Sequence, residues 1–171
     1  MKALPAPFVP LVEAMISTAR QNLEKGEWLS PLSLVGRSST GELFPVAIES
    51  GDVESKELSA RQIRLTAAML KADFVFSIME AWALPKRLLA RHQEILDRYG
   101  SIGNSPHKED VVAFSLETRQ GVWVGSAAIK PKPPSKKKRT FVQVEFIFAD
   151  GVEGRFVGFL PPMTEAEEKL H

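Results

Sequence analysis

Apolar residues near the start of the chain recur at the spacing of a helix that buries one face. Over residues 8–25 they gather on one side of a helix that turns by about 100° per residue. They are Phe8, Leu11, Val12, Met15, Ala19 and Leu23. Gly26 follows this run, and the pattern therefore predicts a first helix that ends at the glycine.

A second helix is predicted after the break at residues 50–52. Ser55 is placed to cap it, because a serine oxygen accepts a hydrogen bond from the backbone N–H groups that a first helical turn leaves unpaired. Its apolar face is expected to carry Leu58, Leu65, Met69 and Ala72.

A third helix is predicted after Pro85, which suits the first turn of a helix, and it is expected to close at Gly100. One face would carry Leu88, His92, Leu96 and Tyr99. On that face His92 is expected to be a half-buried packing residue and not a ligand.

Shorter apolar runs predict strands. Residues 32–35 and 43–48 flank a polar turn and predict a hairpin. Pro45 makes the second run an edge strand, because proline has no N–H to donate to the ladder. The long hydrophobic run at residues 72–84 is typical of a strand in the middle of a sheet.

Two further hairpins are predicted in the second half of the chain. The first joins residues 111–118 to 122–129. The second joins residues 141–149 to 152–160 around Asp150-Gly151, where both central positions tolerate a positive φ. Nine residues with strand character are expected to be largely buried: Phe74, Phe76, Ile78, Val112, Phe114, Leu116, Val144, Phe146 and Phe148.

The order helix, hairpin, helix, strand, helix, hairpin, hairpin predicts an α+β fold. We expect a single domain at residues 1–162, in which a mainly antiparallel sheet of about six or seven strands carries about three helices. Residues 163–171 are expected to form a frayed or disordered tail.

Composition excludes several classes of site. The hydrophobic fraction of 44% and charged fraction of 25% are those of an ordinary globular protein. There is no cysteine, which excludes disulfides, thiolate zinc sites, iron–sulfur clusters and cysteine nucleophiles. Early prolines interrupt any signal-peptide core, and the apolar runs fall far short of the roughly 20 residues that span a membrane. We therefore expect a soluble cytoplasmic protein without a membrane partner.

The chain carries 22 basic and 21 acidic residues, so no global field would draw it to nucleic acid. One local cluster stands out between residues 130 and 139. Its cations are Lys130, Lys132, Lys136, Lys137, Lys138 and Arg139. The cluster is interpreted either as a solvated, mobile connection between hairpins or as a contact for nucleic acid or phosphate. A nuclear-import signal would need a nucleated cell, which nothing in the sequence indicates. No aromatic residue is interleaved with the lysines, which favours the solvated connection.

Glu80, His107 and Glu117 are the candidate catalytic residues. A carboxylate oriented against a histidine can serve as general acid and base, and with a third ligand it can hold a divalent metal. The alternative is that Glu80 accepts hydrogen bonds from Trp82, Arg119 or backbone at the sheet edge, while His107 caps a turn. Trp82 and Arg119 are thus candidate binding residues. Nucleotide, nucleophile-elbow and zinc-helix motifs are missing, so neither a cofactor nor a metal is expected.

Three segments carry a resemblance. They are EAWALP from Glu80, HKEDVVAFSLET from His107 and GVWVGSAAI from Gly121. Together they resemble a loose group of small uncharacterised bacterial and prophage proteins. The group has an HPDR-like turn where this chain has His107-Lys108-Glu109-Asp110, which departs from it. The resemblance implies a bacterial or phage origin and carries no activity.

The sequence thus favours a binding or interaction module that self-associates, with a homodimer expected at the strand edges of residues 43–48 and 152–160. One alternative is a small hydrolase or metal-dependent enzyme that uses Glu80 and His107. Such an enzyme requires the two side chains to converge within about 4 Å in a concave pocket. The other alternative is contact with nucleic acid through residues 130–139. No small-molecule ligand is specified.

Overall fold

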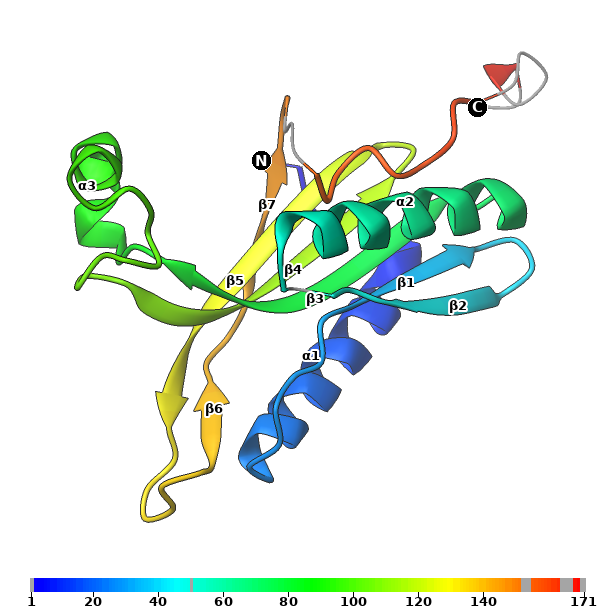
Figure 1. Ribbon diagram of the computed structural model, residues 1–171. Helices are drawn as coiled ribbons and strands as arrows, with labels where there is room; N and C mark the ends of the chain where they lie inside the picture. Colours follow the sequence, from blue (N-terminus) through cyan, green and yellow to red (C-terminus); the bar gives the residue numbers. More distant parts are fainter. Residues whose placement is uncertain (1, 50, 152–154, 164–167, 170–171) are drawn as a thin grey trace.

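The computed structural model describes residues 2–49, 51–151, 155–163 and 168–169. Within these residues seven strands form one curled antiparallel sheet, with helix α1 against one face and helix α2 against the other (Figure 1). The helices are α1 (Val9–Glu24), α2 (Val53–Leu70) and α3 (His92–Tyr99). The strands are β1 (Leu32–Arg37), β2 (Glu42–Ala47), β3 (Phe74–Ala83), β4 (Glu109–Thr118), β5 (Gly121–Pro131), β6 (Arg139–Phe141) and β7 (Glu145–Ala149). The single-domain α+β fold predicted from the sequence is confirmed.

The strand order is β2-β1-β3-β4-β5, and the free side of β5 is shared by two short strands. β7 pairs with the first half of β5, from Val122 to Ser126, and β6 pairs with its last three residues. Strands β3 and β4 are ten residues long and pair along their whole length, from Phe74 opposite Thr118 to Ala83 opposite Glu109. They form the spine of the sheet.

The main core lies between the sheet and α1. It contains the alternate residues of β3 and β4 that were expected to be buried: Phe74, Phe76, Ile78, Val112, Phe114 and Leu116. From α1 it takes Val12, Ala19 and Leu23. Val144, Phe146 and Phe148 are only half-buried, because they lie in or beside β7 at the margin of the sheet.

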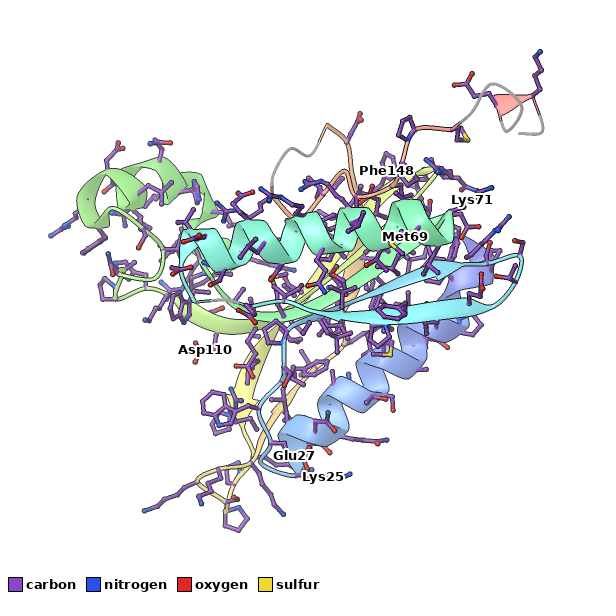
Figure 2. All side chains as sticks on the ribbon, turned by 45° about the vertical axis from the view of Figure 1, so that its right-hand side comes forward. Lys25, Glu27, Met69, Lys71, Asp110 and Phe148 are labelled. Carbon is purple, nitrogen blue, oxygen red and sulfur yellow. The ribbon has the colours of Figure 1, made fainter. Side chains whose placement is uncertain are left out.

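Helix α2 buries a different face from the predicted one. Its buried residues are Ser59, Ala60, Ile63 and Ala67, and the three apolar ones pack with Val35 and Val75 of the sheet. Leu58, Leu65 and Met69 are 55%, 60% and 76% exposed, and Met69 is labelled in Figure 2. The helix has two apolar stripes, and the one with small residues lets its backbone approach the sheet. Ala72 is buried but lies beyond the helix end.

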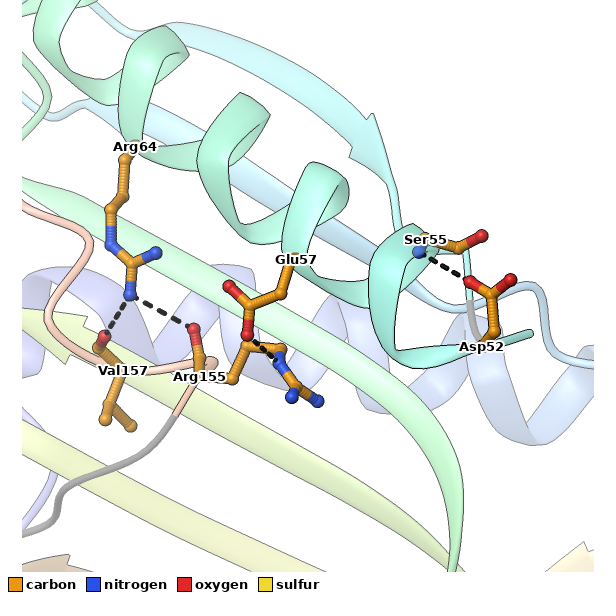
Figure 3. Close-up of polar contacts among 6 residues, drawn as sticks. All are labelled: Asp52, Ser55, Glu57, Arg64, Arg155 and Val157. Carbon is orange, nitrogen blue, oxygen red and sulfur yellow. Dashed lines mark hydrogen bonds and ion pairs between the residues drawn. The ribbon is translucent and has the colours of Figure 1, made fainter.

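The cap of α2 is also one turn earlier than expected. Asp52 is the residue before the helix, and its Oδ1 accepts a hydrogen bond of 2.7 Å from the backbone N–H of Ser55 (Figure 3). This bond to Ser55 lowers the pKa of Asp52 below its usual value.

The helix predicted after Pro85 is divided. Residues Lys86–Arg91 form a 3₁₀ helix and only then does α3 begin. Because a 3₁₀ helix has about three residues per turn, it rotates the positions that follow. Leu88 and Ile95 are therefore buried together with Leu84, while His92 is exposed and its predicted packing role is wrong.

The third predicted hairpin is not formed. Phe141 ends β6, while residues 145–149 form β7 and pair with β5. Residues 152–154 lie outside the described residues, and residues 155–160 have no strand structure. Instead, Arg64 of α2 donates hydrogen bonds to the carbonyl oxygens of Arg155 and Val157 (Figure 3). In the expected tail, residues 164–167 and 170–171 also lie outside the described residues.

None of the helices in the described ranges combines the length and the apolar character that a bilayer-crossing segment needs.

Candidate functional site

Strand β3 extends beyond its neighbour β1. β1 pairs with β3 only from Phe74 to Ile78, whereas β4 follows β3 to Ala83. The end of β3 from Met79 onward therefore has a strand on one side only. A cleft of about 1170 Å³ opens on the other side.

The cleft is lined by segments that are distant in sequence. They are the link from α1 to β1, the end of β3, the start of β4, the β5–β6 hairpin, the start of α2 and the segment at residues 155–156. Figure 2 labels Asp110, which is at the start of β4, and Glu27, which precedes Trp28 in the link from α1 to β1. The lining side chains with charge or large aromatic rings are Trp28, Lys56, Glu80, Trp82, Asp110, Lys136, Lys137, Arg139, Arg155 and Phe156. Among these described residues, five cations face two carboxylates.

Glu80 is held by Arg139. Its Oε1 and Oε2 accept hydrogen bonds from the two terminal guanidinium nitrogens at 3.0 and 3.1 Å. Glu80 Oε1 also accepts a hydrogen bond of 3.3 Å from the backbone N–H of Leu29. Both charged side chains are 23% exposed. This pairing ties the β5–β6 hairpin and the link from α1 to β1 to the end of β3.

Arg139 in turn supports Trp28. The guanidinium carbon lies 4.6 Å from the centre of the indole, within the range of a cation–π contact. Trp28 is nevertheless 78% exposed. An ion pair thus positions an indole whose surface remains largely open to solvent beside the cleft.

Trp82 is the second exposed indole at the cleft, at 56% exposure. The Lys108 ammonium lies 4.5 Å from its ring centre and donates a hydrogen bond to the carbonyl oxygen of Gly103. A Cβ on Gly103 would lie 2.7 Å from the indole, so only glycine permits this approach. The loop after α3 therefore packs against Trp82.

The lysine cluster forms the end of the β5–β6 hairpin. Lys130 and Pro131 pair with Thr140 and Arg139, and the Lys132 N–H donates a hydrogen bond of 2.9 Å to the carbonyl oxygen of Lys138. The five lysine side chains are exposed, as the solvated interpretation predicted. Its predicted mobility stays a prediction, and the hairpin hydrogen bonds give the segment a defined backbone.

The cations of this hairpin divide into two groups. Lys136, Lys137 and Arg139 line the cleft. Lys132 faces α1, where its ammonium lies 3.1 Å from Glu24. Hydrogen bonds from Thr140 and then Lys132 lower the pKa of Glu24. Lys130 and Lys138 do not line the cleft.

His107 and Glu117 have partners of their own. His107 is exposed, does not line the cleft, and its ring meets Tyr99 edge-on with centres 6.4 Å apart. Glu117 is buried and accepts hydrogen bonds from the N–H groups of Phe159 and Leu160 at 3.1 and 3.2 Å.

The structure does not bring the catalytic candidates together. Glu80 lies opposite Val112 while Glu117 lies opposite Val75. Five positions along the strands separate the two carboxylates, or about 17 Å. Arg119 donates a hydrogen bond to the carbonyl oxygen of Pro161, far from Glu80 in the sheet register. Over the described part of the chain, no group of three His, Asp or Glu residues could hold a metal ion.

Sequence reasoning missed Trp28, Lys56, Asp110 and Arg155. Trp28 does carry a signal, because it is a lone aromatic residue that lies just after the helix-ending Gly26 and outside the predicted elements. Its closeness to the lysines could not be seen, since the two segments meet only after the sheet has formed. The lysine run has no aromatic residue of its own, and Trp28, which is distant in the sequence, lines the same cleft.

Comparisons of this chain with protein-family models, with curated proteins and with solved structures find no match.

Proposed function

We propose that this chain is a binding module whose ligand is a phosphate-bearing anion held in the cleft beside β3. The observation that carries the proposal is the convergence of cations from separate elements on one concave site. Lys56 comes from α2, and Lys136 and Lys137 come from the β5–β6 hairpin. Arg155 comes from the segment that Arg64 of α2 contacts by hydrogen bonds.

Three of these cations are paired with no carboxylate among the residues that the structure describes. Arg139 is paired with Glu80, and Arg155 is paired with Glu57 (Figure 3). Within the described ranges, Lys56, Lys136 and Lys137 form no ion pair. Like charges gathered in a cleft raise the local concentration of anions, and the lysine ammonium is a common phosphate ligand. This arrangement supports anion binding.

Binding has more support than catalysis. A hydrolase built on Glu80 and His107 requires a shared pocket, but Glu80 is occupied by Arg139 and His107 lies outside the cleft. We place the module in the cytoplasm of a bacterial or phage-infected cell as part of the same proposal. The lack of cysteine and the sequence resemblance support that location.

Calorimetric titration with sodium tripolyphosphate at low salt tests the proposal. The parent protein should bind, and the double variant Lys136→Ser/Lys137→Ser should bind at least about tenfold more weakly. The matched control is Lys130→Ser/Lys138→Ser, which removes the same charge from the same hairpin outside the cleft and should bind nearly as the parent does. Equal losses in the two variants, or no binding by the parent, would refute the proposal.

A further inference from the structure

We infer that the ligand of the cleft is single-stranded nucleic acid, with a base stacked on Trp28 and phosphates held by the surrounding cations. The inference rests on the proposed anion site and names its ligand class. It starts from the two exposed tryptophans, because a bare phosphate has no planar group that could stack on an indole.

The tryptophans of the chain are distributed unequally. Trp123 is fully buried in the sheet, whereas Trp28 and Trp82 are 78% and 56% exposed, and both line the cleft. Both exposed tryptophans therefore lie at the cleft that is also lined by five cations. Exposed indoles beside a cationic groove are the combination that binds unpaired bases and their phosphates together.

Trp28 is supported for such a role. Arg139 covers one part of the indole at 4.6 Å, and Arg139 is itself fixed by two hydrogen bonds from its guanidinium to Glu80. A ring held in this way loses little conformational freedom when a second planar group stacks on it, which favours binding. Glu80 thus acts as a positioning residue and contributes no contact to the ligand.

The cations suit a chain of phosphates better than a single one. A Cβ atom built on Gly26 would lie 3.6 Å from the Cβ of Lys137. Lys137 of the hairpin therefore lies next to the loop that carries Trp28. Lys56 and Arg155 contribute charge from the α2 side of the same cleft. Its volume, about 1170 Å³, exceeds the roughly 300–1,000 Å³ of a usual small-molecule pocket. The site has room for more than one nucleotide.

The Trp82 side of the cleft differs in charge. Asp110 lies directly opposite Trp82 in the β3–β4 register. A carboxylate repels phosphate but accepts hydrogen bonds from the exocyclic amino groups of bases. We therefore assign this side to bases and the hairpin side to phosphates. A duplex is disfavoured because its bases are already stacked and paired, and stacking on Trp28 requires an unpaired base.

Fluorescence anisotropy with a labelled oligocytidylate of about ten nucleotides, whose bases carry an exocyclic amino group, tests the inference. The Trp28→Ala variant should bind about tenfold or more weakly, while Trp28→Phe should recover most of the affinity. With four phosphate contacts, a plot of log affinity against log salt concentration should have a slope of about −2.8. In the Lys136→Ser/Lys137→Ser variant, which keeps two of these contacts, the slope should be about −1.4. Circular dichroism checks that each variant is folded.

Competition separates this inference from the proposed function. Inorganic polyphosphate of matched charge should displace the oligonucleotide only at higher concentration. The affinity of the protein for polyphosphate should not change in the Trp28→Ala variant. If polyphosphate binds as tightly as the oligonucleotide and Trp28→Ala changes neither affinity, the inference fails while the anion site stands. Tighter binding of a duplex of the same length, or of an acidic peptide, would also overturn the inference. No binding of any of these probes would overturn both.

Discussion

Arg139 and Glu80 form a two-pronged ion pair, with nitrogen–oxygen distances of 3.0 and 3.1 Å, although 59 positions separate them in the sequence. The pair joins the first residue of β6 to the exposed end of β3. It also contacts Trp28, because the guanidinium lies 4.6 Å from the centre of the indole. Stability and the proposed binding site therefore depend on the same contact.

Replacing Glu80 by glutamine should destabilise the fold by about 1–3 kcal/mol. The reason is that Arg139 is 23% exposed and would keep its charge without a carboxylate partner. Urea unfolding measures the change. The control is Glu94→Gln, which breaks the Arg91–Glu94 pair on an exposed helix surface and should have little measurable effect. Equal effects of the two substitutions would contradict this interpretation of the Glu80 pair.

The core between the sheet and α1 should respond strongly to cavities. Phe76 and Phe114 are 0% and 2% exposed, and their ring centres lie 6.1 Å apart. Cutting either to alanine should cost about 3–5 kcal/mol in the free energy of unfolding. Thermal or urea unfolding checks this expectation, and a variant that melts with the parent would show that the residue does not lie in the core.

Two apolar residues of α2, one on each side of Arg64 in the sequence, distinguish its buried face from the predicted one. Ile63 is 0% exposed and Leu65 is 60% exposed. Ile63→Ala should cost about 2–5 kcal/mol, whereas Leu65→Ala should change stability by no more than about 0.5 kcal/mol. Chemical denaturation of both variants under the same conditions compares them. A larger loss of stability in Leu65→Ala than in Ile63→Ala would indicate that the stripe with Leu65 packs against the sheet.

Acid should weaken the contact between α1 and the β5–β6 hairpin. The hydrogen bond from Thr140, and then that from Lys132, lowers the pKa of Glu24 below its usual 4.5. A carboxyl whose pKa is lower in the folded state contributes its full stabilisation above pH 4.5 and loses it as the pH falls toward the folded-state pKa. Urea unfolding from pH 7 downward should show a smaller loss of stability in Glu24→Gln than in the parent. Identical pH profiles would contradict the role of Glu24.

Self-association stays a prediction, and of its two expected interface strands the structure contains β2. β2 is an edge strand that contains Pro45, as expected, and its Leu43 and Phe44 are 45% and 53% exposed. The described residues of the other expected seam, 155–160, form no strand. Sedimentation or light scattering at high protein concentration should return a dimer mass that Phe44→Glu reduces to a monomer mass. A monomer mass for the parent protein would contradict the predicted self-association.

Local patterns were sufficient to predict much of the sheet. The runs that became β1 to β5 were found because alternating or continuous apolar residues leave few alternatives to a strand that packs on a core. Pro45 marked an edge for a purely local reason, since proline lacks the N–H that pairing needs. In contrast, residues 155–160 looked like a strand in isolation, yet hydrogen bonds hold them as an irregular segment. Arg64 donates to the carbonyl oxygens of Arg155 and Val157, and Glu117 accepts from the N–H groups of Phe159 and Leu160.

The sequence by itself determined the α+β class, the main core residues of β3 and β4, and the exposure of the five lysines at residues 130–138, but not the half-buried position of Arg139. Only the tertiary structure decided which stripe of α2 is buried and which residues share the cleft. Three separate segments supply Trp28, Glu80 and Arg139. These residues meet because β3 continues beyond its pairing with β1, and residues of the β5–β6 hairpin line the cleft beside that end of β3. Differences in strand length and register are properties of the assembled sheet, and no local hydrophobic pattern encodes them.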